Sequence, residues 1–358
     1  MQLERFHPRS QLVVEATHIE KPRFPVIEAH SHLGEPFGGG WENRPFEELL
    51  ERLDEARVVH LVDLDGGWGE DILSSHLDAF KAKAPERFSV FGGVDWSKWT
   101  EKGEAFPEWA AGRLPIQKER GAAGLKIWKL LGLTVRDHQD QLAKVDDPRL
   151  DPIWQTAGEL GLPVLIHVGD PVAFFDPVDE TNERWEELQQ HPEWVWTSPP
   201  FPPFLEIMNG LACVVARHPR TTFIGAHVGG YVENLGWVSD LLDRCPNFHV
   251  DISDSIAELG RQPRTARRFF LRHADRILFG TDLGPNPEMS RIYYRFLETA
   301  DEYFNPDTGS VPRQGRWHIY GLDLPEEVLA KVYLKNASKI LGLEGEALAP
   351  SAPGKEAD

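Results

Sequence analysis

Short apolar runs alternate with segments of helical spacing along most of the chain. Eight runs rich in Val, Ile, Leu and Phe predict buried strands. They start at Phe24, Val58, Phe88, Gly124, Pro163, Thr222, Phe248 and Arg276. Between them lie segments whose apolar residues recur three and four positions apart, which predicts helices. These segments are 46–57, 71–84, 108–120, 151–160, 205–218, 232–244 and 263–273. A regular alternation of strands and helices is typical of a parallel sheet.

Eight such repeats predict a (β/α)₈ TIM barrel, an α/β fold that takes about 250 residues. The chain has 358 residues, so a single barrel leaves room for additions. Three stretches rich in Pro, Asp, Gly or aromatic residues predict loop insertions after strands 4, 5 and 8. These stretches are 131–149, 169–203 and 303–323. The expected divisions are an N-terminal extension, the barrel and a flexible tail, at 1–23, 24–343 and 344–358.

Composition and charge narrow the classes of partner. Hydrophobic residues make up 41% and charged residues 27% of the chain, as in globular proteins in solution. No apolar run approaches the roughly 20 residues of a membrane span, and residues 1–23 lack the apolar core of a secretion signal. Two cysteines suit a reducing compartment, so we expect a cytoplasmic protein. A formal net charge of −19 would repel phosphate backbones and anionic lipids. We therefore expect a small-molecule substrate and no nucleic-acid or membrane partner, and we leave a homo-oligomer open.

Residues suited to metal binding stand where four of the predicted strands end. The first strand ends in His30 and His32, whose side chains point the same way because strand residues alternate between faces. His167 and His227 end two later strands, and Asp282 ends the last. Each alone fits a hydrogen-bonded core histidine or a helix-capping acid equally well. In a parallel barrel all strand ends open on one face, so their shared placement predicts one convergent site.

Five motifs in a fixed order make the chain resemble the amidohydrolase superfamily, and within it the amidohydrolase-related branch that includes aminocarboxymuconate-semialdehyde decarboxylase. The resemblance covers nearly the whole barrel. The motifs are Ala29-His30-Ser31-His32, Gly124-Leu125-Lys126, Val164-Leu165-Ile166-His167, Gly225-Ala226-His227 and Phe279-Gly280-Thr281-Asp282.

The resemblance implies a mononuclear metal site. In that family the residues that match His30, His32, His167 and Asp282 hold one divalent metal ion, for which we expect zinc before manganese or iron. A divalent cation lowers the pKa of its bound water towards about 7 and polarises a carbonyl. Asp282 can accept the proton and pass it to the leaving group, while His227 orients the nucleophile or steadies an oxyanion.

Lys126 and Trp128 are candidates for substrate binding. In binuclear relatives a lysine at this strand is carboxylated and bridges two metals, an arrangement we do not expect here. Lys126 instead contacts a substrate anion or pairs with a barrel carboxylate. Trp128, two residues later on the same face, predicts a pocket wall.

The predicted strand-end loops are rich in tryptophan and also carry two acids. The indoles suit either a substrate wall or the packing of loops and subunits. They belong to Trp41, Trp68, Trp96, Trp99, Trp128, Trp185, Trp194 and Trp196. Asp65 and Asp95 suit either hydroxyl binding or, by preference, helix capping.

The sequence therefore predicts a metal-dependent hydrolase that uses a metal-activated water on a small cyclic or aromatic-like substrate. Cleavage of an amide, ester, lactone or C–C bond fits equally. One alternative is a non-oxidative decarboxylase that uses the same metal site and needs a cation, for which Lys126 is the candidate, to hold its carboxylate substrate. The other alternative is a non-catalytic barrel.

Overall fold

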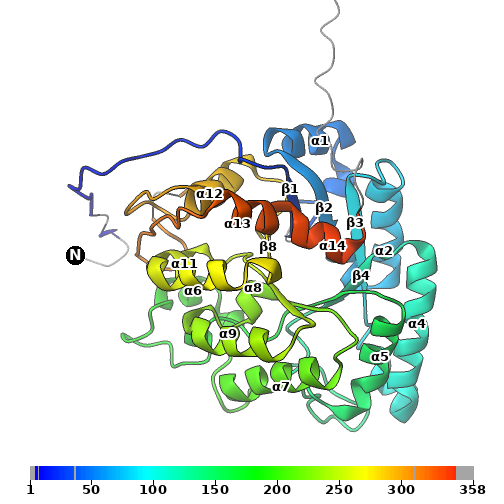
Figure 1. The fold of residues 1–358 in the computed structure, drawn as a ribbon. Helices are drawn as coiled ribbons and strands as arrows, with labels where there is room; N and C mark the ends of the chain where they lie inside the picture. The colour runs from blue at the N-terminus through cyan, green and yellow to red at the C-terminus, as the bar shows by residue number, and fades with distance from the viewer. Residues whose placement is uncertain (1–4, 7, 36–37, 310, 344–358) are drawn as a thin grey trace, which may run out of the picture.

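A computed structural model describes residues 5–6, 8–35, 38–309 and 311–343. The predicted tail at 344–358 lies outside these residues. Part of the predicted N-terminal extension packs along the C-terminal third of the chain (Figure 1). The hydroxyl of Thr17 donates to Asp301 at 2.7 Å, and the backbone N–H of Arg23 donates to Glu298 at 3.0 Å.

Eight parallel strands form one sheet in the order of the sequence. They are β1 (Val26–Ser31), β2 (Val58–Asp63), β3 (Phe88–Gly93), β4 (Gly124–Ile127), β5 (Val164–Ile166), β6 (Phe223–Gly225), β7 (Phe248–Asp251) and β8 (Ile277–Leu278). The first and last strands meet through a parallel bridge between Ser31 and Leu283. The backbone N–H of Asp282 also donates to the carbonyl of His30 at 2.9 Å. The predicted TIM barrel is thus confirmed.

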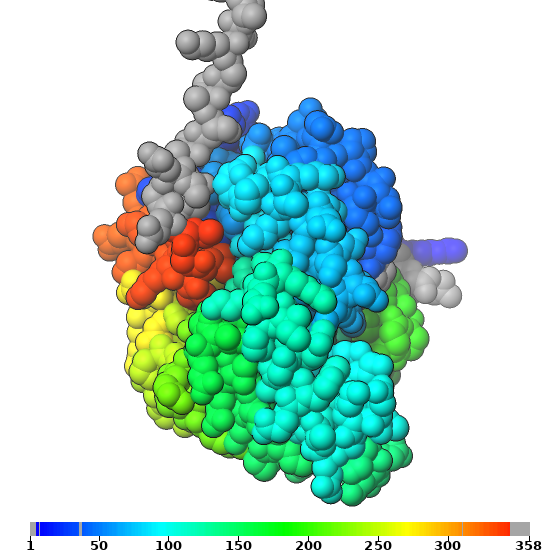
Figure 2. All heavy atoms as spheres, turned by 90° about the vertical axis from the view of Figure 1, so that its right-hand side faces the viewer, coloured from blue at the N-terminus to red at the C-terminus, as the bar shows by residue number. Residues whose placement is uncertain are grey.

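Helices surround the barrel at the predicted places (Figure 1). These are α1 (Phe46–Glu55), α2 (Glu70–His76) with the π-helical turn η4 (Leu77–Lys81), α4 (Phe106–Arg120), α5 (Asp151–Glu159), α7 (Phe204–Arg217), α9 (Leu235–Arg244) and α11 (Pro263–Arg272). Each turns its apolar stripe to the strands, as Leu49 and Leu53 do in α1. Figure 2 shows the C-terminal segment in red next to light-blue and cyan segments from the first third of the chain on the outer surface.

The structure adds helices that the alternating pattern did not predict. Three follow β8 and complete the ring, namely α12 (Pro287–Glu298), α13 (Glu326–Ala330) and α14 (Asn336–Leu341), with the π-helical turn η11 (Lys331–Lys335) between the last two. Short helices also interrupt the loops, namely α3 (Lys98–Lys102), α6 (Trp185–Gln190), α8 (Ala226–Gly229) and α10 (Ile256–Arg261). Of these, α6 lies within the predicted insertion at 169–203, so that stretch is an ordered cover over the strand ends.

Apolar side chains fill the space between strands and helices and also part of the barrel interior. Phe91, Leu165, Ile224 and Leu278 come from β3, β5, β6 and β8 and form one buried cluster. Side chains from such distant strands meet only inside a barrel. Within the described ranges, no helix is long and apolar enough to cross a membrane.

Candidate metal centre and substrate pocket

His30, His32 and Asp282 meet where β1 and β8 close the barrel. Nε2 of His30 lies 2.9 Å from Oδ1 of Asp282, and Nε2 of His32 lies 3.0 Å from the same oxygen. Both imidazoles are buried. Burial opposes the charge of Asp282, yet the facing histidines hold the pKa of this carboxyl well below its ordinary value. Two strands that are far apart in sequence thus bring three metal-ligand groups to one point.

Carboxylates on the far side of the two rings fix their orientation. Nδ1 of His30 donates to Oδ2 of Asp251 at 2.9 Å, and Nδ1 of His32 donates to Oδ1 of Asp65 at 2.7 Å. Since a carboxylate accepts hydrogen bonds, each Nδ1 carries a proton, and each Nε2 is the nitrogen that faces Asp282 and could bind a metal. Asp251, at the end of β7, was not predicted.

Asp65 does not cap a helix, so the preferred prediction for it is wrong. Its other oxygen accepts from the backbone N–H groups of Leu33 and Gly34, at 3.0 and 2.8 Å. Asp63 and His76 form a second buried acid and imidazole pair next to it, joined at 2.6 Å. Asp63 also accepts from the N–H of Leu33. This group therefore supports the end of β1 and, through Asp65, the ring of His32. Asp95 accepts from the backbone N–H of Ser97 in the turn before α3, and the N-cap of that helix is Ser97.

A strained backbone turn presents His227 to the other side of the site. His227 and Val228 both adopt positive φ, 56° and 57°, which costs energy for residues other than glycine. The ring of His227 stacks on His30 with centroids 5.2 Å apart. Its Nδ1 donates to the carbonyl of Ser253 at 2.8 Å, and its Nε2 lies 3.8 Å from Oδ2 of Asp282. His227 thus faces the site through an unprotonated nitrogen.

His167, at the end of β5, lies edge-on to His227 with ring centroids 4.4 Å apart. Its Nε2 is buried and has no hydrogen-bond partner among the residues that the structure describes, since Asp170 stands 3.6 Å away. Burial, reinforced by His227, lowers the pKa of His167 to about 3, so its imidazole is neutral.

The donors gathered here fit a divalent cation. Ligand atoms of His30, His227 and Asp282 all lie within 4.8 Å of one another. Neutral imidazoles together with one carboxylate form a typical zinc donor set. The unpartnered nitrogen of His167 is a further donor next to this group. Of the four predicted ligands, the structure brings His30, His32 and Asp282 into direct contact, whereas it places His167 behind His227.

Lys126 is buried at the floor of the site. Its ammonium lies 3.3 Å from Nε2 of His30 and 4.7 Å from the centre of the Trp128 ring. Burial lowers the pKa of Lys126 to about 8. Gly67 makes room for this side chain, since a Cβ at that position would lie 2.7 Å from Cβ of Lys126.

A cavity of about 260 Å³ opens next to the metal-ligand groups. Trp68, Trp128, Trp194 and Phe174 form its aromatic part. Trp68 stacks on Trp128 with centroids 3.8 Å apart and an angle of 18° between the ring planes. Trp128 therefore lines the cavity. Three of the eight loop tryptophans line the cavity, while others, such as Trp41 and Trp99, are packed into the core.

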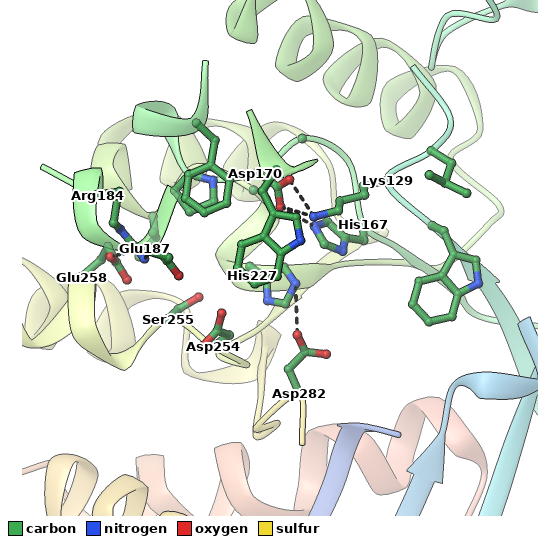
Figure 3. Close-up of a pocket in the computed structure, with 18 of the residues that line it drawn as sticks. Lys129, His167, Asp170, Arg184, Glu187, His227, Asp254, Ser255, Glu258 and Asp282 are labelled. Carbon is green, nitrogen blue, oxygen red and sulfur yellow. Dashed lines mark hydrogen bonds and ion pairs between the residues drawn. The ribbon is translucent and has the colours of Figure 1, made fainter. Parts of the chain in front are cut away.

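Charged side chains that the sequence did not single out line the rest of the cavity (Figure 3). Lys129 binds both oxygens of Asp170, at 2.9 and 2.7 Å. Arg184 pairs with Glu187 at 2.7 Å and contacts Glu258. These residues come from the ends of β4 and β5, the 169–203 insertion and α10. Their spacing in the sequence carries no periodic signal, because only the folding of a long insertion brings them together.

Comparisons with known proteins agree with this architecture. A sequence model for the family described as Amidohydrolase matches residues 37–343. The 2,6-dihydroxybenzoate decarboxylase from Rhizobium has a similar structure, with a TM-score of 0.56 and 18% identity over 90% of this chain and 100% of its own. A putative amidohydrolase from Staphylococcus aureus has a TM-score of 0.57 and 15% identity over 90% of this chain and 100% of its own. A dihydroxybenzoic acid decarboxylase from Polaromonas, solved with bound manganese, has a TM-score of 0.55 and 17% identity over 91% of this chain and 99% of its own. Among curated proteins, no sequence matches the chain. At these identities the solved structures show the shared fold alone.

Proposed function

Because the chain belongs to the amidohydrolase family, we propose that it is a metal-dependent hydrolase acting on a small cyclic or aromatic-like substrate. The observation that carries this proposal is the convergence of two histidine Nε2 atoms, from His30 and His32, on one oxygen of Asp282 at 2.9 and 3.0 Å. Imidazole nitrogens around a carboxylate oxygen are a donor set that a divalent cation such as zinc takes.

We assign His30, His32, His167 and Asp282 as ligands of one divalent cation, with zinc preferred to manganese or iron. The solved manganese-bound relative supports a divalent ion in this family. The fourth position goes to His167 because its buried Nε2 has no hydrogen-bond partner in the described part of the chain. We assign His227 to a place beside the cation, with its Nε2 3.8 Å from Oδ2 of Asp282.

A divalent cation held there would supply acidification of a bound water and polarisation of the bond to be cleaved. The side chains around it handle the protons. Asp282 accepts a proton through its second oxygen, which lies 3.8 Å from Nε2 of His227. Asp282 then passes that proton to the leaving group, while His227 orients the nucleophile or steadies an oxyanion. Trp68 and Trp128, stacked on each other, form an aromatic wall beside these groups against which a flat ring can pack.

Decarboxylation is the second candidate, because two of the similar structures belong to decarboxylases of dihydroxybenzoates. Such a substrate is a carboxylate and needs, in addition to the metal ion, a cationic side chain that is available to bind it. Lys129 and Arg184 are already paired with carboxylates. Lys126 lies against His30. Because these cationic side chains already have partners, we favour hydrolysis over decarboxylation. For the same reason we favour a neutral or cationic small molecule as the substrate over a polyanion such as nucleic acid.

Elemental analysis of protein purified without chelators tests the metal assignment. We expect about one equivalent of zinc, manganese or iron per chain. His30→Ala should lose it, and the control His18→Ala, which changes an exposed histidine, should keep it. Absence of metal from all three proteins would reject the proposed mechanism. Product analysis of turned-over substrates, a new acid or alcohol as against CO₂, then separates hydrolysis from decarboxylation.

A further inference from the structure

The cavity beside the metal-ligand groups has more acidic than basic residues. Six of the lining residues are acidic and three are basic. The acids are Asp170, Glu187, Glu233, Asp254, Glu258 and Asp282, and the bases are Lys126, Lys129 and Arg184. Each base also has a partner inside the site. The excess of negative charge therefore belongs to the pocket itself and is unlike a site built for an anion.

The excess is concentrated in one part of the cavity, which we call the acidic wall and define as Glu187, Glu233, Asp254 and Glu258. Figure 3 shows three of these, Glu187, Asp254 and Glu258, on one side of His227 and Asp282. Arg184 lies among them and pairs with both Glu187 and Glu258. One guanidinium cannot neutralise two carboxylates, and Glu233 and Asp254 add to the imbalance.

Glu233 gives the clearest sign that a ligand group is missing. One of its oxygens accepts from the backbone N–H of Val172 at 2.9 Å. The other, Oε2, is buried and finds no hydrogen-bond partner among the residues described. A buried carboxylate oxygen without a donor is costly, so native sites usually supply one. Burial raises the pKa of Glu233 and also that of Glu187, so a cationic ligand beside them would favour their ionised forms.

The aromatic part of the same cavity suits a cation as well. Trp68, Trp128 and Trp194 already stack on neighbouring rings, and the aromatic surface that they present to the cavity attracts positive charge. A volume of about 260 Å³ lies at the small end of ligand pockets, which limits the guest to about one ring and a short substituent.

We propose that this cavity binds substrates that carry a positively charged nitrogen group on a single flat ring. The nitrogen donates to Glu233 and its neighbours in the acidic wall, the ring stacks on the tryptophans, and the bond to be cleaved faces the metal-ligand groups. This assignment rests on the proposed hydrolase function and specifies its substrate class. A substrate with a carboxylate at the far end would instead face four acids.

Binding of three ring compounds of matched size tests the assignment by titration calorimetry on the full chain. The probes are benzylamine, benzyl alcohol and benzoate, each added to zinc-loaded and to chelator-treated protein. We expect benzylamine to bind at least about ten-fold more tightly than benzyl alcohol in both forms, with an affinity that falls as salt is added. Equal affinities for the two, or no detectable binding of benzylamine, would overturn the proposal. So would binding of benzoate to the chelator-treated form as tight as that of benzylamine.

Two variants assign the effect to the acidic wall. Glu233→Gln keeps an oxygen to accept from Val172 but removes the charge, and we expect it to weaken benzylamine at least about five-fold without changing benzyl alcohol. Glu206→Gln removes the same charge from an exposed residue that pairs with Lys144 at 2.8 Å, outside the cavity, and should leave both affinities unchanged. Equal responses of the two variants would reject the role of Glu233. The chelator-treated protein tests the acidic wall without metal. A preference for benzylamine in this form would therefore support the acidic wall even if elemental analysis showed that the protein binds no metal. Failure of the metal assignment and failure of the substrate assignment can thus be told apart.

Discussion

Nδ1 of His30 donates to Oδ2 of Asp251 across 2.9 Å, and this carboxylate is fully buried at the end of β7. The contact decides which ring nitrogen of His30 carries the proton and therefore which one faces Asp282. Ser253 adds a second contact, since its hydroxyl donates to Asp251 at 2.5 Å. Asp251 thus acts on the site through His30 and is a positioning residue.

Asp251→Asn should lower zinc affinity by about 10 to 100-fold, because the amide neither fixes the ring nor strengthens its basicity as a carboxylate does. Competition with a chromophoric zinc chelator measures this. Asp240→Asn, an exposed position in α9, is the matched control and should bind zinc like the unchanged protein. A zinc affinity of Asp251→Asn equal to that of the control would show that the contact has no role in positioning.

Arg184→Gln should lower the free energy of unfolding by about 3 to 5 kcal/mol. The change leaves the buried Glu258 and the nearly buried Glu187 without their cation, and removal of one partner from a buried ion pair is strongly destabilising. Arg261→Gln breaks a pair with Glu183 that is largely exposed, so its cost should stay within about 1 kcal/mol. Denaturant unfolding of both variants measures the difference, and similar costs would contradict the role of burial.

Gly67→Ala should destabilise the fold by about 1 to 3 kcal/mol and disturb the Lys126 and Trp128 side chains. The new methyl group would lie 2.7 Å from Cβ of Lys126 and 3.1 Å from Nε1 of Trp128, closer than packed atoms allow. Gly69→Ala, two residues later, meets nothing within 4 Å and should change stability by less than about 0.5 kcal/mol. Thermal unfolding and tryptophan fluorescence report both effects. If Gly69→Ala proved as costly as Gly67→Ala, a general loss of loop freedom would be the cause.

Stability should fall in acid through His60. Burial lowers the pKa of His60 to about 4, and its Nδ1 donates to the carbonyl of Glu86 at 2.8 Å. Between pH about 4 and 6.5 the unfolded chain therefore binds a proton at this residue that the folded chain does not, so the free energy of unfolding decreases as the pH falls through that window. The contribution of this one group is about 3 kcal/mol over the whole window.

In His60→Gln, the free energy of unfolding should fall by about 3 kcal/mol less between pH about 6.5 and 4 than in the unchanged protein. Denaturant unfolding at a series of pH values measures this difference. His249, whose pKa burial also lowers to about 4, titrates in both proteins and cancels in the comparison. His18→Gln, at an exposed site, should leave the slope unchanged. An unaltered slope in His60→Gln would show that its ring is not held neutral.

Most of the barrel and part of the candidate site could be predicted from the sequence. Strand ends could be recognised because apolar runs stop at polar residues, which located His30, His32, His167, His227 and Asp282. Asp251 gave the same signal at the end of the seventh run, and it could have been identified by the rule that located Asp282. The helices after β8 were missed because the strand count was already complete.

The acidic wall could not have been predicted by any local rule. Arg184 and Glu258 are 74 residues apart, and one of them lies in an insertion whose path depends on tertiary contacts. Ion pairs have no periodicity in sequence, so a residue pattern cannot say which acids a cation will reach. The same holds for Glu233, whose unpartnered oxygen is visible only once the cavity exists.

Because the barrel closes between its first and last strands, the residues of the candidate metal site are synthesised at widely separated times. His32 and Asp282 are 250 residues apart in the chain. At about 5 to 20 residues per second, the ribosome makes the second roughly 10 to 50 seconds after the first. For that interval the nascent polypeptide displays only the histidine half of the centre, so we expect metal to be captured as a closing step of biogenesis, after most of the fold has been translated.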